Sequence, residues 1–348
     1  ARALGIPCIL GVKDAASIIK SGDELVADAV KGEIIISPSA DEKAEYSLLK
    51  EQEQNERLML KEYINKPTVT KSGLKKAVYA NIAKAEDVHG AVVNGAEGIG
   101  LFRTEFLYMD RNQAPGEDEQ FEAYSSVAKA MGGREVIIRT LDVGGDKHIP
   151  YLEIEKEENP FMGLRAIRYC LKNTELFKVQ LRALLRAACY GNIKIMLPLV
   201  CTEDEVIKAK SLLEECKAEL SAEGKEYKKD IKLGIMVETP AAVLVAERLA
   251  AVSDFFSIGT NDLTGYTMAA DRGNNEVSYL YNSNDPAVLK AIEITVKSAK
   301  RANIPVGMCG EAAADPKMIP RLIDWGLDEF SVSSSRILKT RKLICDCE

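Results

Sequence analysis

Charged and amide side chains stand directly after several short apolar runs in this sequence. The run "FFSI" is followed within a few residues by Asn261 and Asp262. Four other runs end in the same way, on Arg103 and Glu105, on Arg139 and Asp142, on Glu238, and on Cys309 and Glu311. For any one position, an ordinary strand-terminating residue explains the pattern equally well. For the whole set that explanation is poor, because a buried arginine or carboxylate must be solvated or paired.

The chemistry of this set points to a small phosphorylated acid. Three arginines are permanently cationic and suited to bidentate hydrogen bonds with phosphate or carboxylate. They are Arg103, Arg139 and Arg272, the last in "AADRGN". Glu238 and Asp262 supply the hard oxygen ligands that Mg²⁺ takes when a phosphate completes its coordination shell. We therefore predict a metal-bridged site. The alternative is a buried ion-pair network without a ligand, with Glu105, Asp142 and Glu311 as the partners.

Two further features are weak when taken singly. "LDVGGDK" places a glycine pair before Lys147, so that backbone amides and a point charge could approach a phosphate. Most such glycine pairs are only turns. Cys309, in "VGMCGE", lies close to two glycines, and we expect little shielding of its thiol. In a cationic site its pKa could fall and it could exchange a proton with a substrate carbon. The alternative is a small core residue.

The elements that must position these groups form a regular alternation from about residue 73 onward. Helical stretches, such as residues 203–223, lie between eight short apolar runs. The runs are "KAVYANIA", "GIGLFRTE", "EVIIRTLDVG", "IKIMLPLV", "KLGIMVETP", "FFSIGTND", "VGMCGE" and "EFSVSS". This pattern predicts an α/β fold, a closed (β/α)8 TIM barrel, in which the carboxyl ends of the strands meet at one mouth. An open doubly wound sheet is the alternative, although no G-x-G-x-x-G follows the first strand.

The composition excludes several classes of protein. The 348 residues are 46% hydrophobic and 28% charged, as in soluble globular proteins. A net charge of −7 argues against a general nucleic-acid or anionic-membrane binder. The eight cysteines form no CxxC pair, which favours free thiols in a reducing cytoplasm. No apolar run is long enough to span a bilayer.

The first part of the chain differs from the rest. Residues 1–40 contain short strands and turns, with too few apolar residues for a core of their own. Residues 41–66 are charge-dense with a sparse apolar stripe, which predicts an exposed connecting helix that Pro67 ends.

With these residues in view, the chain resembles the carboxyl-terminal, phosphoenolpyruvate (PEP)-binding part of the PEP–protein phosphotransferase family, Enzyme I of the bacterial sugar phosphotransferase system. The resemblance runs along nearly the whole chain. It rests on "NGAEGIGLFRTEFLYMDR", "RTLDVGGDK", "ENPFMGLRAIR", "QLRALLRA", "GIMVETPAA", "FFSIGTNDLTGYTMAADRGN" and "VGMCGE". Pyruvate phosphate dikinase and PEP synthase share the barrel and several strand ends, but the first two segments are closer to Enzyme I.

The resemblance implies a role for each matching residue. Glu238 and Asp262 would hold Mg²⁺, and Cys309 would be the proton donor. The residues that would bind PEP are Arg103, Arg139, Asn261, Asp262 and Arg272, with Lys147 and Arg165 supporting the phosphate end. The implied product is pyruvate, and the phosphoryl group would pass to a histidine and then to a histidine-containing phosphocarrier protein. The family also forms homodimers through this barrel.

In this family the acceptor histidine lies in a "TSH" motif just before an "ARALGIP"-like segment, with which this sequence begins. We therefore expect a fragment that lacks the acceptor, whose residues 1–40 are the remnant of a swivelling phosphohistidine domain, and whose barrel, 67–348, lacks a final segment. Such a chain would bind PEP without completing the transfer alone. Two other functions compete: the PEP-binding domain of a dikinase or synthase, and a non-catalytic PEP sensor.

Overall fold

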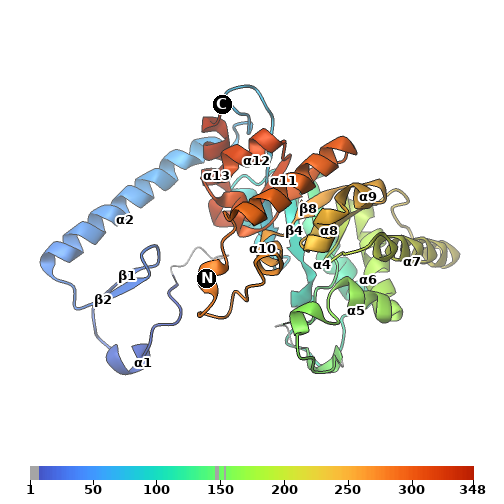
Figure 1. Ribbon diagram of the computed structural model, residues 1–348, viewed down its shortest axis with the longest axis horizontal. Helices are drawn as coiled ribbons and strands as arrows, with labels where there is room; N and C mark the ends of the chain where they lie inside the picture. Colours follow the sequence, from blue (N-terminus) through green and yellow to red (C-terminus); the bar gives the residue numbers. More distant parts are fainter. Residues whose placement is uncertain (1–7, 146–148, 153) are drawn as a thin grey trace. The chain divides into compact units, whose positions relative to one another are not determined.

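The computed structural model describes residues 8–145, 149–152 and 154–348. The chain divides into two compact units, Ala1–Lys66 and Pro67–Glu348 (Figure 1).

The first unit is small and mostly exposed. A short helix, α1 (Ala15–Ile18), precedes two antiparallel strands, β1 (Leu25–Asp28) and β2 (Glu33–Ile36). The long helix α2 (Ala40–Leu60) begins at Ser39, whose side chain accepts a hydrogen bond from the Glu42 amide while the Glu42 carboxylate accepts one from the Ser39 amide. This reciprocal cap satisfies two amides that the first helical turn leaves unpaired. Leu60 is the only buried residue of α2, and the role of residues 41–66 as a connecting helix stays a prediction. The assignment of residues 1–40 to a phosphohistidine domain stays a prediction.

The second unit is the predicted TIM barrel. Eight parallel strands close in the order β10-β3-β4-β5-β6-β7-β8-β9, which confirms the barrel and excludes the open sheet. Seven of the strands lie within one of the eight apolar runs, and β6 begins one residue before its run. The strands are β3 (Ala77–Ile82), β4 (Ile99–Arg103), β5 (Glu135–Arg139), β6 (Asn192–Leu197), β7 (Lys232–Val237), β8 (Phe256–Ile258), β9 (Val306–Met308) and β10 (Glu329–Ser333).

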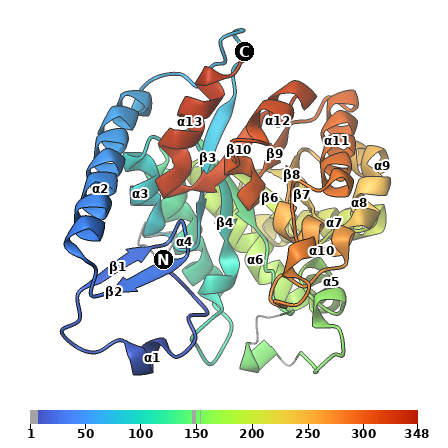
Figure 2. The same cartoon turned by 60° about the vertical axis from the view of Figure 1, so that its left-hand side comes forward.

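Helices surround these strands (Figure 2). They are α3 (Asp87–Val93), α4 (Glu117–Ala130), α5 (Ile167–Lys172), α6 (Thr174–Ala187), α7 (Glu203–Ala222), α8 (Pro240–Leu244), α9 (Ala246–Ala251), α10 (Thr260–Met268), α11 (Pro286–Arg301), α12 (Ile319–Trp325) and α13 (Ile337–Asp346). Within the described ranges, no helix is both long enough and apolar enough to cross a membrane.

The barrel has two separate apolar clusters because successive side chains of a strand point to opposite faces. The larger cluster fills the layer between strands and helices, and includes Phe102, Ile138 and Phe330. The smaller cluster lies inside the barrel. Its members are Leu101, Ile137, Met196, Met236, Phe255 and Cys309. This inner layer forms the floor beneath the polar groups at the strand ends.

Candidate active site

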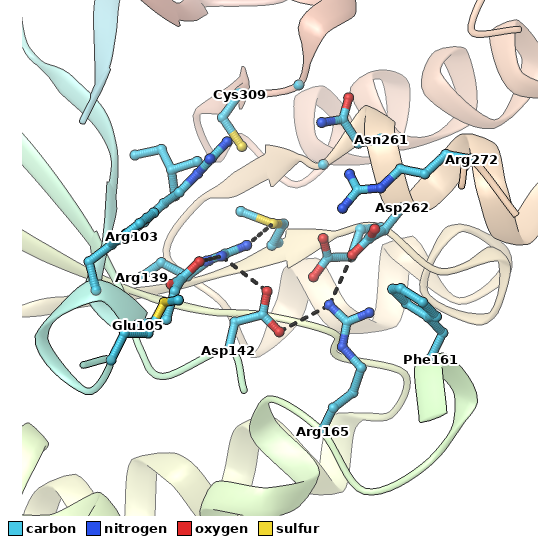
Figure 3. Close-up of a pocket in the computed structure, with 17 residues that line it drawn as sticks. Arg103, Glu105, Arg139, Asp142, Phe161, Arg165, Asn261, Asp262, Arg272 and Cys309 are labelled. Carbon is cyan, nitrogen blue, oxygen red and sulfur yellow. Dashed lines mark hydrogen bonds and ion pairs between the residues drawn. The ribbon is translucent and has the colours of Figure 1, made fainter. Parts of the chain in front are cut away.

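A cavity of about 270 Å³ opens among the strand ends predicted to carry the site. The predicted residues that line it are Arg103, Arg139, Arg165, Glu238, Asn261, Asp262, Arg272 and Cys309 (Figure 3). They come from segments that lie up to 206 positions apart in the sequence, between Arg103 and Cys309. Lys147, also predicted for this site, lies outside the described residues. Glu311 is exposed and does not line this cavity, although its sequence position suggested that it would.

Two of the arginines are held in a continuous chain of ion pairs (Figure 3). Nη2 of Arg139 lies 2.7 Å from Glu105 and 3.0 Å from Asp142. Nη2 of Arg165 lies 3.0 Å from the other oxygen of Asp142 and 3.1 Å from Asp262. Burial opposes the charge of Arg139, but the carboxylates of Glu105 and Asp142 outweigh it and raise the pKa of this arginine. The ion-pair network considered from the sequence is therefore present around these two arginines.

Arg103 is different. Its guanidinium makes no ion pair or hydrogen bond with any residue that the structure describes. Burial and then the nearby charge of Arg139 lower the pKa of Arg103. Its side chain extends along the wall of the cavity toward Cys309 (Figure 3). A partly buried cation without a carboxylate partner is destabilising unless an anion binds beside it.

The segment after β8 supplies the opposite wall. Asn261 and Asp262 are in the first turn of α10, which starts directly at the strand end. The carbonyl of Asn261 accepts a hydrogen bond from the Tyr281 hydroxyl at 2.7 Å, and its side-chain oxygen accepts one from the Glu311 amide at 3.3 Å. Arg272 follows the left-handed turn that ends α10 at Ala269. These bonds fix Asn261 across the cavity from Arg103, and Arg272 lies on the same side as Asn261 (Figure 3).

The two predicted metal ligands lie in the same cavity. Glu238 is buried, and one of its oxygens accepts a 2.6 Å hydrogen bond from the Leu199 amide. Gly259 leaves room for it, since a Cβ there would lie 2.7 Å from the other oxygen. Burial, and then the charges of Asp262 and Asp142, raise the pKa of Glu238. A divalent cation between Glu238 and Asp262 would relieve this repulsion, so the donor set fits Mg²⁺.

Two carboxylates alone do not make a complete metal site. Among the described residues, no group of three or more His, Cys, Asp or Glu side chains is placed to hold a metal ion. A cation here would therefore need oxygens from a bound ligand, which is how Mg²⁺ is usually held at phosphate sites.

Cys309 differs from the expectation in two ways. Its side chain is 5% exposed, not poorly shielded. Its pKa is raised to about 11, mainly by burial, where a fall was expected from the nearby arginines. The reason is that the loss of water around the sulfur outweighs the attraction of the cations. Its carbonyl accepts a 3.0 Å hydrogen bond from the amide of Asn81, which fixes the strand end. With a pKa of about 11, the thiol is protonated at neutral pH.

Of the cavity residues that were not assigned to the site from the sequence, four contact its arginines. Glu105 and Asp142 were noticed as strand-end carboxylates. Each lies two or three residues after an arginine, Arg103 or Arg139, and this spacing was the sequence signal for a place at the same strand ends. Met236, whose sulfur lies 3.8 Å from Nη1 of Arg139, looked like an ordinary strand residue. Phe161, in the "ENPFMGLRAIR" segment, places its ring centroid 5.5 Å from the guanidinium carbon of Arg165. No periodicity predicts these last two contacts.

Comparison with known proteins shows the family to which the chain belongs. Residues 58–348 match the family model described as PEP-utilising enzyme, PEP-binding domain. The chain is 49% identical to the phosphoenolpyruvate-protein phosphotransferase of Bacillus subtilis over 348 residues, 99% of this chain and 60% of that protein. It is 49% identical to that of Geobacillus stearothermophilus over 341 residues, 98% and 59%. The protein of the same name in Listeria innocua is 47% identical over 344 residues, 99% and 60%. The chain thus spans about 60% of the length of these relatives.

A solved structure of an HpcH/HpaI aldolase/citrate lyase family protein from Burkholderia cenocepacia aligns with 82% of this chain and 96% of that chain. The identity is 15% and the TM-score is 0.47.

Proposed function

This chain belongs to the PEP-utilising enzymes through their PEP-binding domain, and we propose that its barrel binds PEP for a PEP–protein phosphotransferase. One observation carries the proposal: four arginines, two carboxylates suited to Mg²⁺ and a protonated thiol line a single cavity. Each of these groups matches one part of PEP: its phosphate, its carboxylate or its methylene carbon.

The arginines bind and orient the substrate in this proposal. Arg103 has no carboxylate partner among the described residues, so its full positive charge is available to an incoming phosphate. Arg139 and Arg165 are held in place by Glu105, Asp142 and Asp262, which fixes their donors before the substrate arrives. Such preorganised cations stabilise the charge that spreads over the phosphoryl oxygens during transfer.

Glu238 and Asp262 would hold Mg²⁺, and Asn261 would donate from the same wall. When bound, the ion would neutralise negative charge on the substrate oxygens. The cavity holds four arginines and four carboxylates, so its protein charges balance when all four carboxylates are ionised, as Mg²⁺ would favour for Glu238; they are Arg103, Arg139, Arg165 and Arg272, and Glu105, Asp142, Glu238 and Asp262. The anionic substrate would then bring the need for a further cation.

Cys309 is the proposed proton donor. The phosphorus–oxygen bond of PEP breaks as a bond from phosphorus to the acceptor imidazole nitrogen forms, and the enolate of pyruvate is released. The thiol then gives its proton to the methylene carbon of the enolate, which yields pyruvate and leaves a thiolate that solvent reprotonates. A pKa of about 11 keeps the proton on sulfur until this step.

The whole-protein context is part of the proposal. The phosphoryl acceptor would be a histidine, and a histidine-containing phosphocarrier protein would follow it in sugar uptake. We place the protein in the cytoplasm, as a homodimer formed through the barrel. The support is the relatives' name and their identity of 47–49% along nearly the whole chain.

The proposal is tested first by calorimetric titration of the chain with PEP, with and without Mg²⁺. We expect one site per chain and tighter binding when Mg²⁺ is present. An absence of PEP binding under both conditions would refute the proposal.

A second assay separates a phosphotransferase from a PEP sensor. The histidine-bearing domain of a relative is supplied separately, and pyruvate release is measured. Pyruvate formation in proportion to the added domain is expected, whereas binding without any transfer would favour the sensor. A dikinase or synthase would instead show formation of PEP or pyruvate that depends on nucleotide when its nucleotide-binding domain is added.

A further inference from the structure

The "QLRALLRA" segment has no part in the site as described so far. It forms the second half of α6, and its two arginines, Arg182 and Arg186, pair with Glu117 of α4. Gln180 is 0% exposed. A fully buried amide needs a specific set of hydrogen-bond partners.

Gln180 finds two of these partners at the strand ends that carry Arg103 and Arg139, and a third in the Tyr124 hydroxyl of α4, to which its Nε2 donates at 3.1 Å. Its Nε2 donates to Oγ1 of Thr104 at 3.1 Å, and its Oε1 accepts from the Leu141 amide at 2.9 Å. Thr104 follows Arg103 directly, and Leu141 lies between Arg139 and Asp142. The hydroxyl of Thr104 in turn donates to the Arg139 carbonyl at 2.8 Å.

These bonds begin where the backbone ladder stops. The last register pair between β4 and β5 joins Arg103 to Arg139. Beyond it, the side chains of Thr104 and Gln180 link the two segments in place of backbone hydrogen bonds. The ion pair between Arg139 and Glu105 spans the same junction on the cavity side. Gln180 therefore lies directly behind the part of the site that would bind the phosphate.

We propose that Gln180 is a positioning residue for the PEP site. Its amide sets the spacing between the ends of β4 and β5, and thereby the position of Arg103 relative to Arg139 and Asp142. It touches no substrate and lies outside the residues that line the cavity. This inference rests on the proposed function, because it assigns the arginines to PEP.

The competing explanation is that Gln180 only satisfies polar atoms in the core. The chain offers a matched control in Gln120 of α4, also 0% exposed. Gln120 binds the hydroxyls of Tyr108 and Tyr124 and the carbonyl of Pro115. It therefore belongs to the same buried network, joined to Gln180 through the Tyr124 hydroxyl, without bonding to either strand end. Loss of either amide should cost stability, but only Gln180 should affect PEP binding.

The experiment compares Gln180→Met with Gln120→Met in the full chain. Dissociation constants for PEP are measured by calorimetry at saturating Mg²⁺, and melting temperatures are measured alongside. We expect Gln180→Met to weaken PEP binding by about tenfold, which corresponds to partial loss of one hydrogen bond to a charged group. The dissociation constant of Gln120→Met for PEP should stay within about twofold of wild type. Its melting temperature should fall about as much as that of Gln180→Met, since each variant loses a buried hydrogen-bonding amide.

A second pair of variants tests the link through Thr104. Thr104→Val removes the hydroxyl and should weaken PEP binding as Gln180→Met does, whereas Thr104→Ser keeps the hydroxyl and should lie closer to wild type. The double variant Gln180→Met/Thr104→Val should bind no more weakly than either single variant, since both break one link. If Gln180→Met does not fold, the comparison of Thr104→Val with Thr104→Ser tests the positioning role by itself.

The outcomes are distinct. Equal PEP affinities for Gln180→Met and Gln120→Met, or for Thr104→Val and Thr104→Ser, would overturn the positioning role while leaving the proposed function intact. A wild-type chain that does not bind PEP would overturn the proposed function, and the positioning role with it.

Discussion

The two ends of the barrel interior both contain charged side chains, but they are arranged differently. At the mouth, arginines and carboxylates alternate around a cavity, and Arg103 is left without a carboxylate partner among the described residues. At the opposite end, where the strands begin, Lys194 pairs with Glu135 at 2.5 Å and Glu329 is buried close to them. The inner apolar layer that includes Ile137 and Met196 lies between these two ends.

The end of the barrel where the strands begin is closed around Glu329. Gly100 of β4 and Gly307 of β9 face its carboxyl group, and a Cβ at either position would clash with it. Burial, and then the charge of Glu135, raise the pKa of Glu329 well above its ordinary value. Buried charge at this end is thus neutralised by pairing or protonation, as expected for a packing layer. At the mouth, an unpaired cation remains exposed to a cavity, as expected for a binding site. Four predictions test this contrast.

The largest effect is expected for Cys309→Ala. Turnover of PEP with the histidine-bearing domain should fall by about 100-fold or more, because a positioned general acid contributes about 10²–10⁴-fold. PEP affinity, measured by calorimetry, should change little. Unchanged turnover would remove Cys309 as the proton donor.

Loss of Arg103 should weaken PEP binding alone, whereas loss of Arg139 should also lower the stability of the fold. Arg103→Met is expected to raise the dissociation constant of PEP by about 10- to 100-fold, the loss of one charged hydrogen-bonding partner. Its melting temperature should be close to that of wild type, since no carboxylate loses its cation. The control, Arg139→Met, removes the cation between Glu105 and Asp142 and should destabilise the fold by about 3–5 kcal/mol. Similar melting temperatures for the two variants would contradict the difference in pairing.

Glu238→Ala is expected to abolish the dependence of PEP affinity on Mg²⁺, because one of two carboxylate ligands is lost. The control is Glu311→Ala, which removes an exposed strand-end carboxylate that does not line the cavity. Titrations with and without Mg²⁺ should still differ for that variant. If Glu238→Ala keeps the Mg²⁺ dependence, the metal assignment is wrong.

The smallest effect is expected at the closed end, for Glu329→Gln. The raised pKa means that, between the unfolded and folded pKa values, the folded protein holds one proton more than the unfolded chain. The stabilisation from Glu329 is complete below the unfolded pKa and is lost as the pH rises through the folded value. Glutamine does not titrate, so Glu329→Gln should be more stable than wild type at alkaline pH. The gain in stability should grow with pH between the unfolded and the folded pKa of Glu329.

Chemical denaturation at several pH values measures this difference, and PEP affinity should be unchanged throughout. An equal pH dependence for wild type and variant would show that Glu329 is not buried in the protonated form. A loss of PEP affinity would show that the two ends of the barrel are not independent.

The barrel itself could be predicted from the sequence. Parallel strands are buried on both faces, so each appears as a short apolar run separated from the next by a helical period, and all eight runs became strands in the predicted order. The candidate site residues could also be singled out. Burying an arginine or a carboxylate at a strand end costs free energy unless the charge is paired or binds a ligand. Their partners could not be predicted in detail. The pairing of Arg165 with Asp262 joins two segments 97 positions apart.

What the sequence by itself determined is the periodicity that makes a barrel and the side-chain types available at its mouth, since both are local properties of the chain. Only the tertiary structure decided which arginine stays unpaired, that burial raises the pKa of Cys309, and that Gln180 joins two strand ends. The physical reason is that desolvation, ion pairing and hydrogen bonding depend on neighbours that the fold brings together from distant positions in the chain.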